Sequence, residues 1–279
     1  MIRTREILLS SFQEVIDLIR PEQVGRHWFR GRSPTPQSRI FGGQVLAQCL
    51  LAANATVDEA LMAHSMHAYF LRAGDPETPI EFDVDPIRDG RSFATRRVVA
   101  RQHGDAIFNT SISYQITEAG FTHSEAMPDV PTPEEAAKLE LGPTYPRFSD
   151  MYQVERIRVT ARSNKPQQKQ QNWFRAQGGL EADPRLHQAA LALISDCALL
   201  GTSFYPQGMN DWDINHVAAS LDHAIWFHEP VDVTEFILYE CDSPWAGNAR
   251  GFNRGRLWSR DGTLLASTAQ EALVRPKTR

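Results

Sequence analysis

The stretch from Arg185 to Leu200 constrains the fold of this chain more than any other segment. Its apolar residues recur at the spacing of one helical face and widen it around most of the circumference; they are Leu186, Ala189, Ala190, Ala192, Leu193, Ile194, Cys197, Leu199 and Leu200. A helix that is apolar on most sides is usually buried. Pro184 precedes it, where the missing N–H of proline costs nothing. The pattern therefore predicts a central helix that other elements must cover.

Asp196 lies in the last turns of this apolar helix and conflicts with two local preferences. A buried carboxylate is costly unless it is paired or hydrogen-bonded, and an acid near a helix C-terminus meets the unfavourable end of the helix dipole. Such conflicts tend to mark functional sites. Two interpretations of Asp196 remain open at this point: a functional carboxylate, or a structural one that accepts a hydrogen bond from a neighbouring backbone N–H.

The second half of the chain repeats the pattern of the first half. A first apolar helix is predicted from Ile40 to Ala53, and residues 64–70 (HSMHAYF) align with residues 220–226 (SLDHAIW) at an offset of 223 − 67 = 156. Hairpin turns at Gly104 and Gly262 are offset by 262 − 104 = 158. Each helix is followed by an antiparallel run of strands, predicted at 63–71, 79–86, 92–102 and 106–116, and at 220–228, 235–241, 250–259 and 264–274. The pattern predicts an α+β fold in which two similar sheets each wrap one helix, side by side in one chain.

The periodic pattern is lost between these halves, from Ala119 to Pro146. This segment holds five prolines and the acidic pair Glu134-Glu135, a composition typical of a linker. We therefore predict an N-terminal domain over residues 1–118, an interdomain linker over 119–150, and a C-terminal domain over 151–279 that carries Asp196.

Composition and spacing argue against several classes of function. The net charge of −5 disfavours a nucleic-acid binder, which needs a basic face. The three cysteines are far apart in apolar segments, as expected of reduced thiols. We see neither a signal-peptide core nor an apolar run of about 20 residues, so a cytoplasmic location without a membrane span is expected. His64 and His67 form an HxxH pair on a predicted strand, where residues three apart face opposite sides, so we expect no metal and no cofactor.

Several longer motifs are similar to those of the type II (TesB-like) acyl-CoA thioesterase family. The motifs are RIFGGQVLAQ (39–48), HSMHAYFLRAGD (64–75), RDGRSF (88–93), SLDHAIWFH (220–228), ARGF (249–252) and ASTAQE (266–271). The resemblance covers nearly the whole chain and is weakest in the linker. It implies a double hotdog fold, in which each antiparallel sheet wraps a long central helix, and an enzyme that hydrolyses fatty acyl-CoA to free fatty acid and CoA.

The same resemblance implies a catalytic trio of Asp196, Ser220 and Gln270, which match the Asp, the Ser or Thr, and the Gln of the family. A thioester is poorly stabilised by resonance and its thiolate leaves easily, so an oriented water suffices as the nucleophile. Asp196 can accept a proton from that water, while a hydroxyl and an amide orient it. In the repeat alignment Ser220 falls on His64 and Asp196 on the region Ile40–Gly43, so we expect one active site per chain.

Three further residues are candidate substrate contacts. His64 is a candidate for lining the acyl-CoA cleft, with a satisfied buried histidine as the alternative. Arg250 and Arg254 alternate with Arg256 on one predicted strand face and are candidates for binding CoA phosphates, with a solvated arginine row as the alternative.

Two other functions remain open from the sequence. Residues 213–216 (DINH) weakly resemble the Asp…Asn…His signature of hotdog enoyl-CoA hydratases, but lack its flanking Gly and Pro. A non-catalytic acyl-CoA-binding protein is the other alternative, against which the intact trio argues. In each case acyl-CoA or enoyl-CoA is the expected partner, and nucleic acid is not. A homo-oligomer is also expected, because soluble proteins often form symmetric assemblies.

Overall fold

The structure, a computed structural model, describes residues 9–34, 38–139, 141, 151–209 and 215–277. The elements of the N-terminal half are α1 (Phe12–Ile19), β1 (Glu22–Gln23), β2 (Trp28–Gly31), α2 (Gly42–Asn54), β3 (Met62–Phe70), β4 (Ile80–Asp89), β5 (Phe93–Gln102) and β6 (Asp105–Gln115). Those that follow are α3 (Pro133–Ala137), β7 (Val154–Arg158), β8 (Lys169–Ala176), α5 (Pro184–Ser195), the 3₁₀ helix η1 (Leu200–Gln207), β9 (His216–Ser220), β10 (Asp222–Phe227), β11 (Ile237–Gly247), β12 (Arg250–Ser259) and β13 (Leu264–Pro276).

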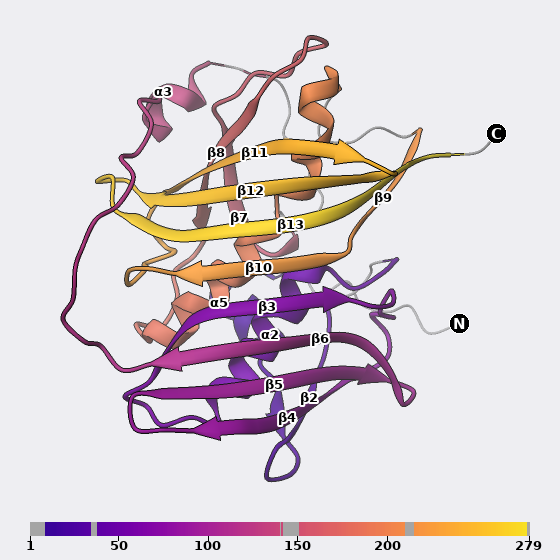
Figure 1. Ribbon diagram of the computed structural model, residues 1–279, viewed down its shortest axis with the longest axis vertical. Coiled ribbons are helices and arrows are strands. Elements are labelled where there is room, and N and C mark those ends of the chain that lie inside the picture. Colours follow the sequence, from indigo (N-terminus) through magenta and orange to yellow (C-terminus); the bar gives the residue numbers. More distant parts are fainter. Residues whose placement is uncertain (1–8, 35–37, 140, 142–150, 210–214, 278–279) are drawn as a thin grey trace.

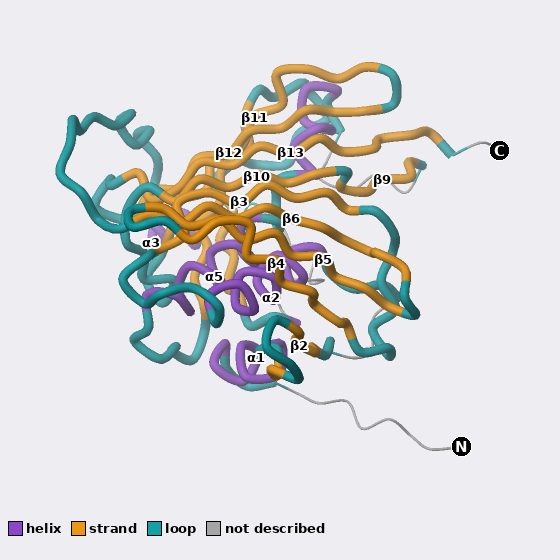
Figure 2. The backbone as a smooth tube through the Cα atoms, turned by 60° about the horizontal axis from the view of Figure 1, so that its bottom comes forward, coloured by secondary structure: helices purple, strands orange, loops and turns teal. Residues whose placement is uncertain are grey.

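One antiparallel sheet of 13 strands runs through the whole molecule (Figure 1). Its order is β1-β2-β4-β5-β6-β3-β10-β13-β12-β11-β8-β7, and β9 also pairs with β13. The two halves join where β3 pairs with β10, with Ala68 opposite His223. The helices α1, α2 and α5 all lie on one side of the sheet (Figure 2). The prediction of two sheets that each wrap a helix is confirmed, and their fusion edge to edge is the double hotdog arrangement.

The two central helices lie against each other in antiparallel directions. A Cβ atom on Gly43, near the start of α2, would lie 2.4 Å from the carbonyl oxygen of Leu193, near the end of α5, so only glycine allows this close approach. At the other end, the Arg185 guanidinium donates hydrogen bonds to the carbonyl oxygens of Asn54 and Leu61, both at 2.9 Å. The end of α5 therefore meets the beginning of α2.

The apolar character of α5 follows from its place in the core. Contrary to the expectation that the chain has no apolar run of this length, the segment Pro184–Gln207, which comprises α5 and η1, is long and apolar enough to cross a membrane by length and composition. In the fold, 72% of its 18-residue apolar window is buried inside the protein. The same composition is what a helix needs when it is covered by a sheet on one side and a second helix on another.

The proline-rich segment between the halves packs against the C-terminal half. Trp173 donates its indole N–H to the carbonyl oxygen of Pro131 at 2.9 Å, and Arg260 makes two hydrogen bonds to Glu134, at 2.9 and 2.7 Å. A buried apolar cluster also joins this segment to the strands of the C-terminal half; its members are Ala136, Trp173, Phe236, Leu238 and Trp258. The part of the segment around Pro131–Ala136 is therefore packed against the C-terminal half, whereas residues 119–126 are exposed.

The internal repeat is present, but the offset of 156 is wrong by one residue at β3 and β10. The buried positions of β3, Met66 and Ala68, correspond to the buried positions of β10, His223 and Ile225, at an offset of 157. His67, which the sequence match aligns with His223, is exposed. A shift of one residue on a strand exchanges the two faces of the sheet, so the error reverses which side chains point at the helices.

The repeat alignment also misplaces the equivalent of Asp196. Asp196 is the residue that flanks the end of α5, and the residue that flanks the end of α2 is Ala55. The position equivalent to Asp196 is thus Ala55 and not the region Ile40–Gly43, which begins α2. The first half still lacks an acid at the equivalent position.

Candidate active site

Asp196 is held between the end of its own helix and the beginning of the neighbouring one. Its side chain is 5% exposed, and Oδ1 accepts a hydrogen bond from Gln270 Nε2 at 2.7 Å. The backbone N–H of Gly43 donates a second hydrogen bond to the carboxylate. Because Gly43 lies in the first turn of α2, an acid at the unfavourable end of α5 reaches the favourable N-terminus of α2. A Cβ on Gly42 would lie 2.6 Å from Oδ2, so a side chain there would displace the carboxylate or the Phe70 ring beside it.

The environment of Asp196 tunes its affinity for a proton. Burial raises the pKa of Asp196 to about 6, while the hydrogen bonds from Gln270 and Gly43 and the positive charge of Arg39 lower it. A carboxylate with a pKa near the working pH can take up and release a proton during a reaction. The perturbed pKa and the enclosed position together favour the functional interpretation of Asp196 over the structural one.

Gln270 connects Asp196 to a second buried group, His223. Gln270 is fully buried on β13, and its Nε2 lies 3.2 Å from Nδ1 of His223. Nε2 of His223 lies 2.9 Å from the hydroxyl of Ser195, which donates to the carbonyl oxygen of Ala192 at 2.8 Å. Burial lowers the pKa of His223 to about 3, so the ring is neutral and its 3.9 Å separation from the Asp196 carboxylate is not an ion pair. Sequence analysis had assigned no role to His223.

A β-bulge brings Ser220 and His223 to the same face of the sheet. Ser220 pairs with Ala272 of β13, whereas Ala224 pairs with Ala269, so four residue steps oppose three. The extra residue lies at the junction of β9 and β10. Without it, residues three apart would face opposite sides. With it, Ser220 lies on the same face of the sheet as Gln270 and diagonally across from it on the neighbouring strand. Such diagonal neighbours are typically about 7–8 Å apart.

Two buried polar atoms at this site have no hydrogen-bond partner among the described residues. One is Gln270 Oε1, and the other is Nδ2 of Asn253, which lies directly opposite Gln270 on β12. The Asn253 Oδ1 accepts a hydrogen bond from the Ser203 hydroxyl at 2.9 Å. Buried polar atoms are rarely left unpaired, so this acceptor and this donor on facing residues have the hydrogen-bonding capacity to bind a polar molecule such as water. Asn253 was also missed by sequence analysis, because a lone Asn in a strand carries no motif.

The three candidate substrate contacts are not brought to Asp196. Arg254 lies on the other face of the sheet from Asn253 and makes two hydrogen bonds with Asp242, at 2.9 and 3.1 Å. Arg250 shares that outer face and pairs with Glu271 at 3.4 Å. His64 lies near the start of β3, six residues from Phe70 at the end that reaches Gly42, and bonds to the Ser113 hydroxyl at 2.8 Å.

Asp222, which precedes His223, has a structural role, because its Oδ1 accepts the backbone N–H of Glu271 at 2.6 Å. Residues 213 and 214 of the weak hydratase signature lie outside the described residues. No group of three or more His, Cys, Asp or Glu side chains that could hold a metal occurs in the described part of the chain.

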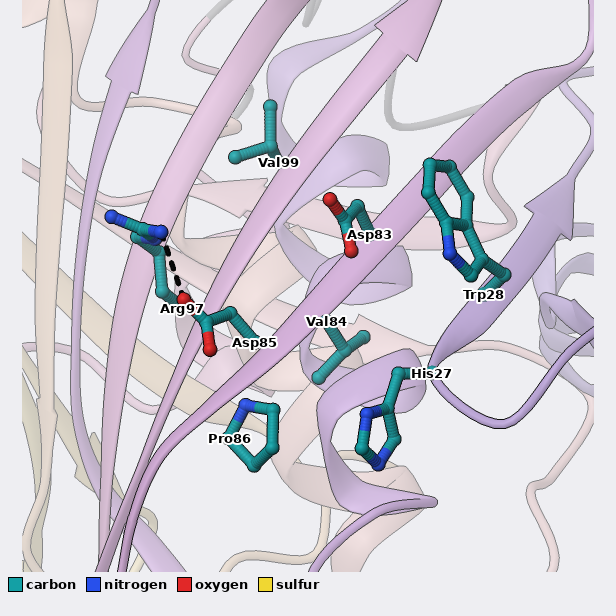
Figure 3. A pocket seen from close by; sticks show the side chains of 8 residues that line it. All are labelled: His27, Trp28, Asp83, Val84, Asp85, Pro86, Arg97 and Val99. Carbon is teal, nitrogen blue, oxygen red and sulfur yellow. Dashed lines mark hydrogen bonds and ion pairs between the residues drawn. The ribbon is translucent and has the colours of Figure 1, made fainter.

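A separate hollow of about 300 Å³ lies on the N-terminal half (Figure 3). Its lining residues are His27, Trp28, Asp83, Val84, Asp85, Pro86, Arg97 and Val99. It lies over β2, β4 and β5, and none of the residues around Asp196 contributes to it. Arg97 and Asp85 neutralise each other across it at 2.8 Å, and the hollow contains none of the unpaired buried atoms.

Comparison with known proteins identifies the family. A family model described as the acyl-CoA thioesterase N-terminal domain matches residues 29–115, and one described as the C-terminal domain matches residues 124–274. Acyl-coenzyme A thioesterase 8 of Rattus norvegicus is 40% identical over 297 residues, covering 99% of this chain and 91% of that protein. Acyl-CoA thioesterase 2 of Haemophilus influenzae is 35% identical, covering 94% of this chain and 96% of that protein.

A solved structure agrees with this assignment in both sequence and fold. The acyl-CoA thioesterase II TesB2 of Mycobacterium marinum superposes with a TM-score of 0.82 at 35% identity, covering 95% of this chain and 99% of that chain. Both domain matches, the relatives matched over nearly their full length and the shared double hotdog therefore lead to one conclusion: this chain belongs to the TesB-like acyl-CoA thioesterase II family.

Proposed function

We propose that this chain, a thioester hydrolase by its family, cleaves fatty acyl-CoA with a water molecule held by Asp196, Ser220 and Gln270. The observation that carries the proposal is the buried Asp196 carboxylate, with its raised pKa, bonded to Gln270 at 2.7 Å and placed at the N-terminus of α2. The acyl-CoA substrate is inferred from the relatives, which are named acyl-CoA thioesterases.

The proposed reaction needs no covalent intermediate. Asp196 takes one proton from the water while the water oxygen attacks the thioester carbonyl carbon. The tetrahedral intermediate then collapses, the carbon–sulfur bond breaks, and the departing CoA thiolate receives the proton from Asp196. The products are a fatty acid and CoA with a free thiol.

Each member of the trio has a separate task in this scheme. The Gln270 Nε2 donor fixes the Asp196 carboxylate, and its unpaired Oε1 supplies an acceptor for the second hydrogen of the water. Ser220, on the same sheet face, offers a hydroxyl that can both donate and accept. Holding the water in one orientation removes much of the entropic cost of the reaction, up to about 7–11 kcal/mol in favourable cases.

Release of free thiol from acyl-CoA tests the proposal directly. The purified chain should release thiol from saturated fatty acyl-CoA, measured with a thiol-reactive chromophore, with turnover that scales with enzyme concentration. Enoyl-CoA should be hydrolysed at its thioester without prior loss of the enoyl absorbance. Hydration of the double bond would instead support the hydratase alternative, and saturable binding without turnover would support an acyl-CoA-binding protein.

The pH dependence of hydrolysis should follow the ionisation of Asp196. The reaction requires the carboxylate form, and burial raises the pKa of this group to about 6. Activity should therefore fall as pH drops through about 6, well above the pH at which an ordinary aspartate is protonated. We expect kcat, measured at saturating substrate from pH 4.5 to 8, to lose about tenfold per pH unit below this point. A flat profile down to pH 4.5 would exclude Asp196 as the proton acceptor.

A further inference from the structure

We propose that His223 is a positioning residue that fixes which way the Gln270 amide points. This inference rests on the proposed function, because it gives Gln270 Oε1 to the reacting water and Nε2 to Asp196. His223 does not touch the water in this scheme; it acts through Gln270.

The argument starts from the two partners of Gln270 Nε2. An ionised carboxylate can only accept hydrogen bonds, and Nε2 lies 2.7 Å from Asp196 Oδ1. A neutral imidazole nitrogen without a proton also can only accept, and Nε2 lies 3.2 Å from His223 Nδ1. An NH2 group has two hydrogens, one for each acceptor. Reversing the amide would place Oε1 against two acceptors, so both contacts together select one orientation.

The hydrogen bonds of the Ser195 hydroxyl determine which ring nitrogen of His223 carries the proton. The Ser195 hydroxyl has a single hydrogen, which it donates to the Ala192 carbonyl oxygen at 2.8 Å. Its oxygen can then only accept from His223 Nε2 at 2.9 Å, so Nε2 carries the proton and Nδ1 is bare. The backbone carbonyl oxygen of Ser195 also has a partner, because it accepts a hydrogen bond from the Tyr239 hydroxyl at 2.8 Å.

This chain of hydrogen bonds runs from the backbone of α5 to the catalytic carboxylate. It passes from the Ala192 carbonyl through Ser195, His223 and Gln270 to Asp196, and every donated hydrogen in it has one acceptor. The helix that ends at Asp196 therefore also fixes the side chain that orients Asp196. Only Gln270 Oε1 is left over, buried and without a partner among the described residues.

Two substitutions at position 223 separate this role from packing. His223→Leu removes one of the two acceptors at similar volume, so that only the Asp196 carboxylate still selects the orientation of the Gln270 amide. His223→Asn keeps an oxygen acceptor near the place of Nδ1. We expect His223→Leu to lower kcat about 10- to 100-fold with KM changed less than about twofold, as misplacement of a reacting group does. His223→Asn should recover most of that loss. His67→Leu, on the exposed face of β3, is the matched control and should leave kcat unchanged.

The pH profile gives a readout that lost packing would not move. The Gln270 hydrogen bond lowers the pKa of Asp196, so a less firmly held Gln270 amide in His223→Leu should move the acid limb of kcat to higher pH. The other charged or titratable groups facing this carboxylate are Arg39, Cys197 and Tyr239, and all are unchanged in the variant. His223→Asn should keep the wild-type limb.

Three results would overturn the proposal. They are a kcat for His223→Leu within about twofold of wild type, equal losses in the Leu and Asn variants with the acid limb in its original place, and a proton on Nδ1 of His223 in the wild-type protein. Nitrogen-15 NMR of the histidine rings reads the last point without any variant, and we expect Nε2 to carry the proton between pH 6 and 8. Failure of the proposed function would show earlier, as absence of thiol release by the wild-type chain.

Discussion

Replacing Asp196 by asparagine should lower kcat for acyl-CoA hydrolysis by about 10²- to 10⁴-fold, the range attributed to a positioned general base. The amide has nearly the shape of the carboxylate and can still accept from Gln270 Nε2, which lies 2.7 Å away in the wild-type protein. It cannot take a proton from water. KM should change little, because the substitution removes an interaction made during the reaction and not one made in binding. Thiol release under saturating acyl-CoA measures the effect.

The stability of the same variant provides its control. The folded-state pKa of Asp196 is raised from 3.8 to about 6, so the folded state holds this proton more tightly than the unfolded chain does. The group therefore favours the folded state at low pH and opposes it as pH rises through this range, by up to about 3 kcal/mol at neutral pH. Asp196→Asn should have a Tm at pH 7 equal to or above that of wild type. Near wild-type thiol release by a well-folded variant would remove Asp196 from the mechanism.

Ser220→Ala and Gln270→Ala should each slow hydrolysis by about 10²-fold, and the double variant should be little slower than the poorer single one. The physical reason is that both side chains are proposed to orient one water for Asp196, so that losing either leaves the water unaligned. Residues that act as a unit show such non-additive losses. The measurement is kcat for the wild type, both single variants and the double variant under the same conditions.

A matched control for this double-mutant cycle is available on the same strand as Gln270. Ser267 is on β13 but bonds to His228 at 2.9 Å on the other face of the sheet, so Ser267→Ala should leave kcat unchanged. If the two losses at Ser220 and Gln270 instead multiply to about 10⁴-fold, the residues act independently. The shared-water scheme would then be wrong, and Gln270 would be left with the role of holding Asp196.

Much of the fold was predictable from local pattern. The helical periodicity from Arg185 to Leu200 predicted α5, and the alternation around Gly104 and Gly262 predicted the paired strands of both halves. The reason is that burial on one face sets the period of apolar residues in any element that covers a core. The motif resemblance predicted Asp196 and Gln270 from segments 74 residues apart, and the structure places them in hydrogen-bond contact.

The sequence pattern failed where a strand departed from regular alternation. The polar composition of Gln167–Gln171 favours a solvated turn, yet Gln170 is fully buried and donates to the Ala198 carbonyl and the Thr202 hydroxyl, both at 3.0 Å. Polar composition alone does not show that another element of the fold supplies buried hydrogen-bond acceptors. His64 and Arg254 were singled out by their chemistry, and which face of the sheet they occupy follows from pairing that the sequence does not display.

By itself, then, the sequence determined the helices, the strands, the duplication and the residue types available for chemistry, because these depend on neighbours along the chain. Only the tertiary structure decided which of those residues meet. One extra residue between Ser220 and Ala224, set by pairing with β13, turns Ser220 and His223 toward the same face. The antiparallel packing of α2 and α5, possible because Gly42 and Gly43 lack side chains, gives Asp196 a helix N-terminus from the other half of the molecule. Both are contacts between distant segments, and no local periodicity encodes them.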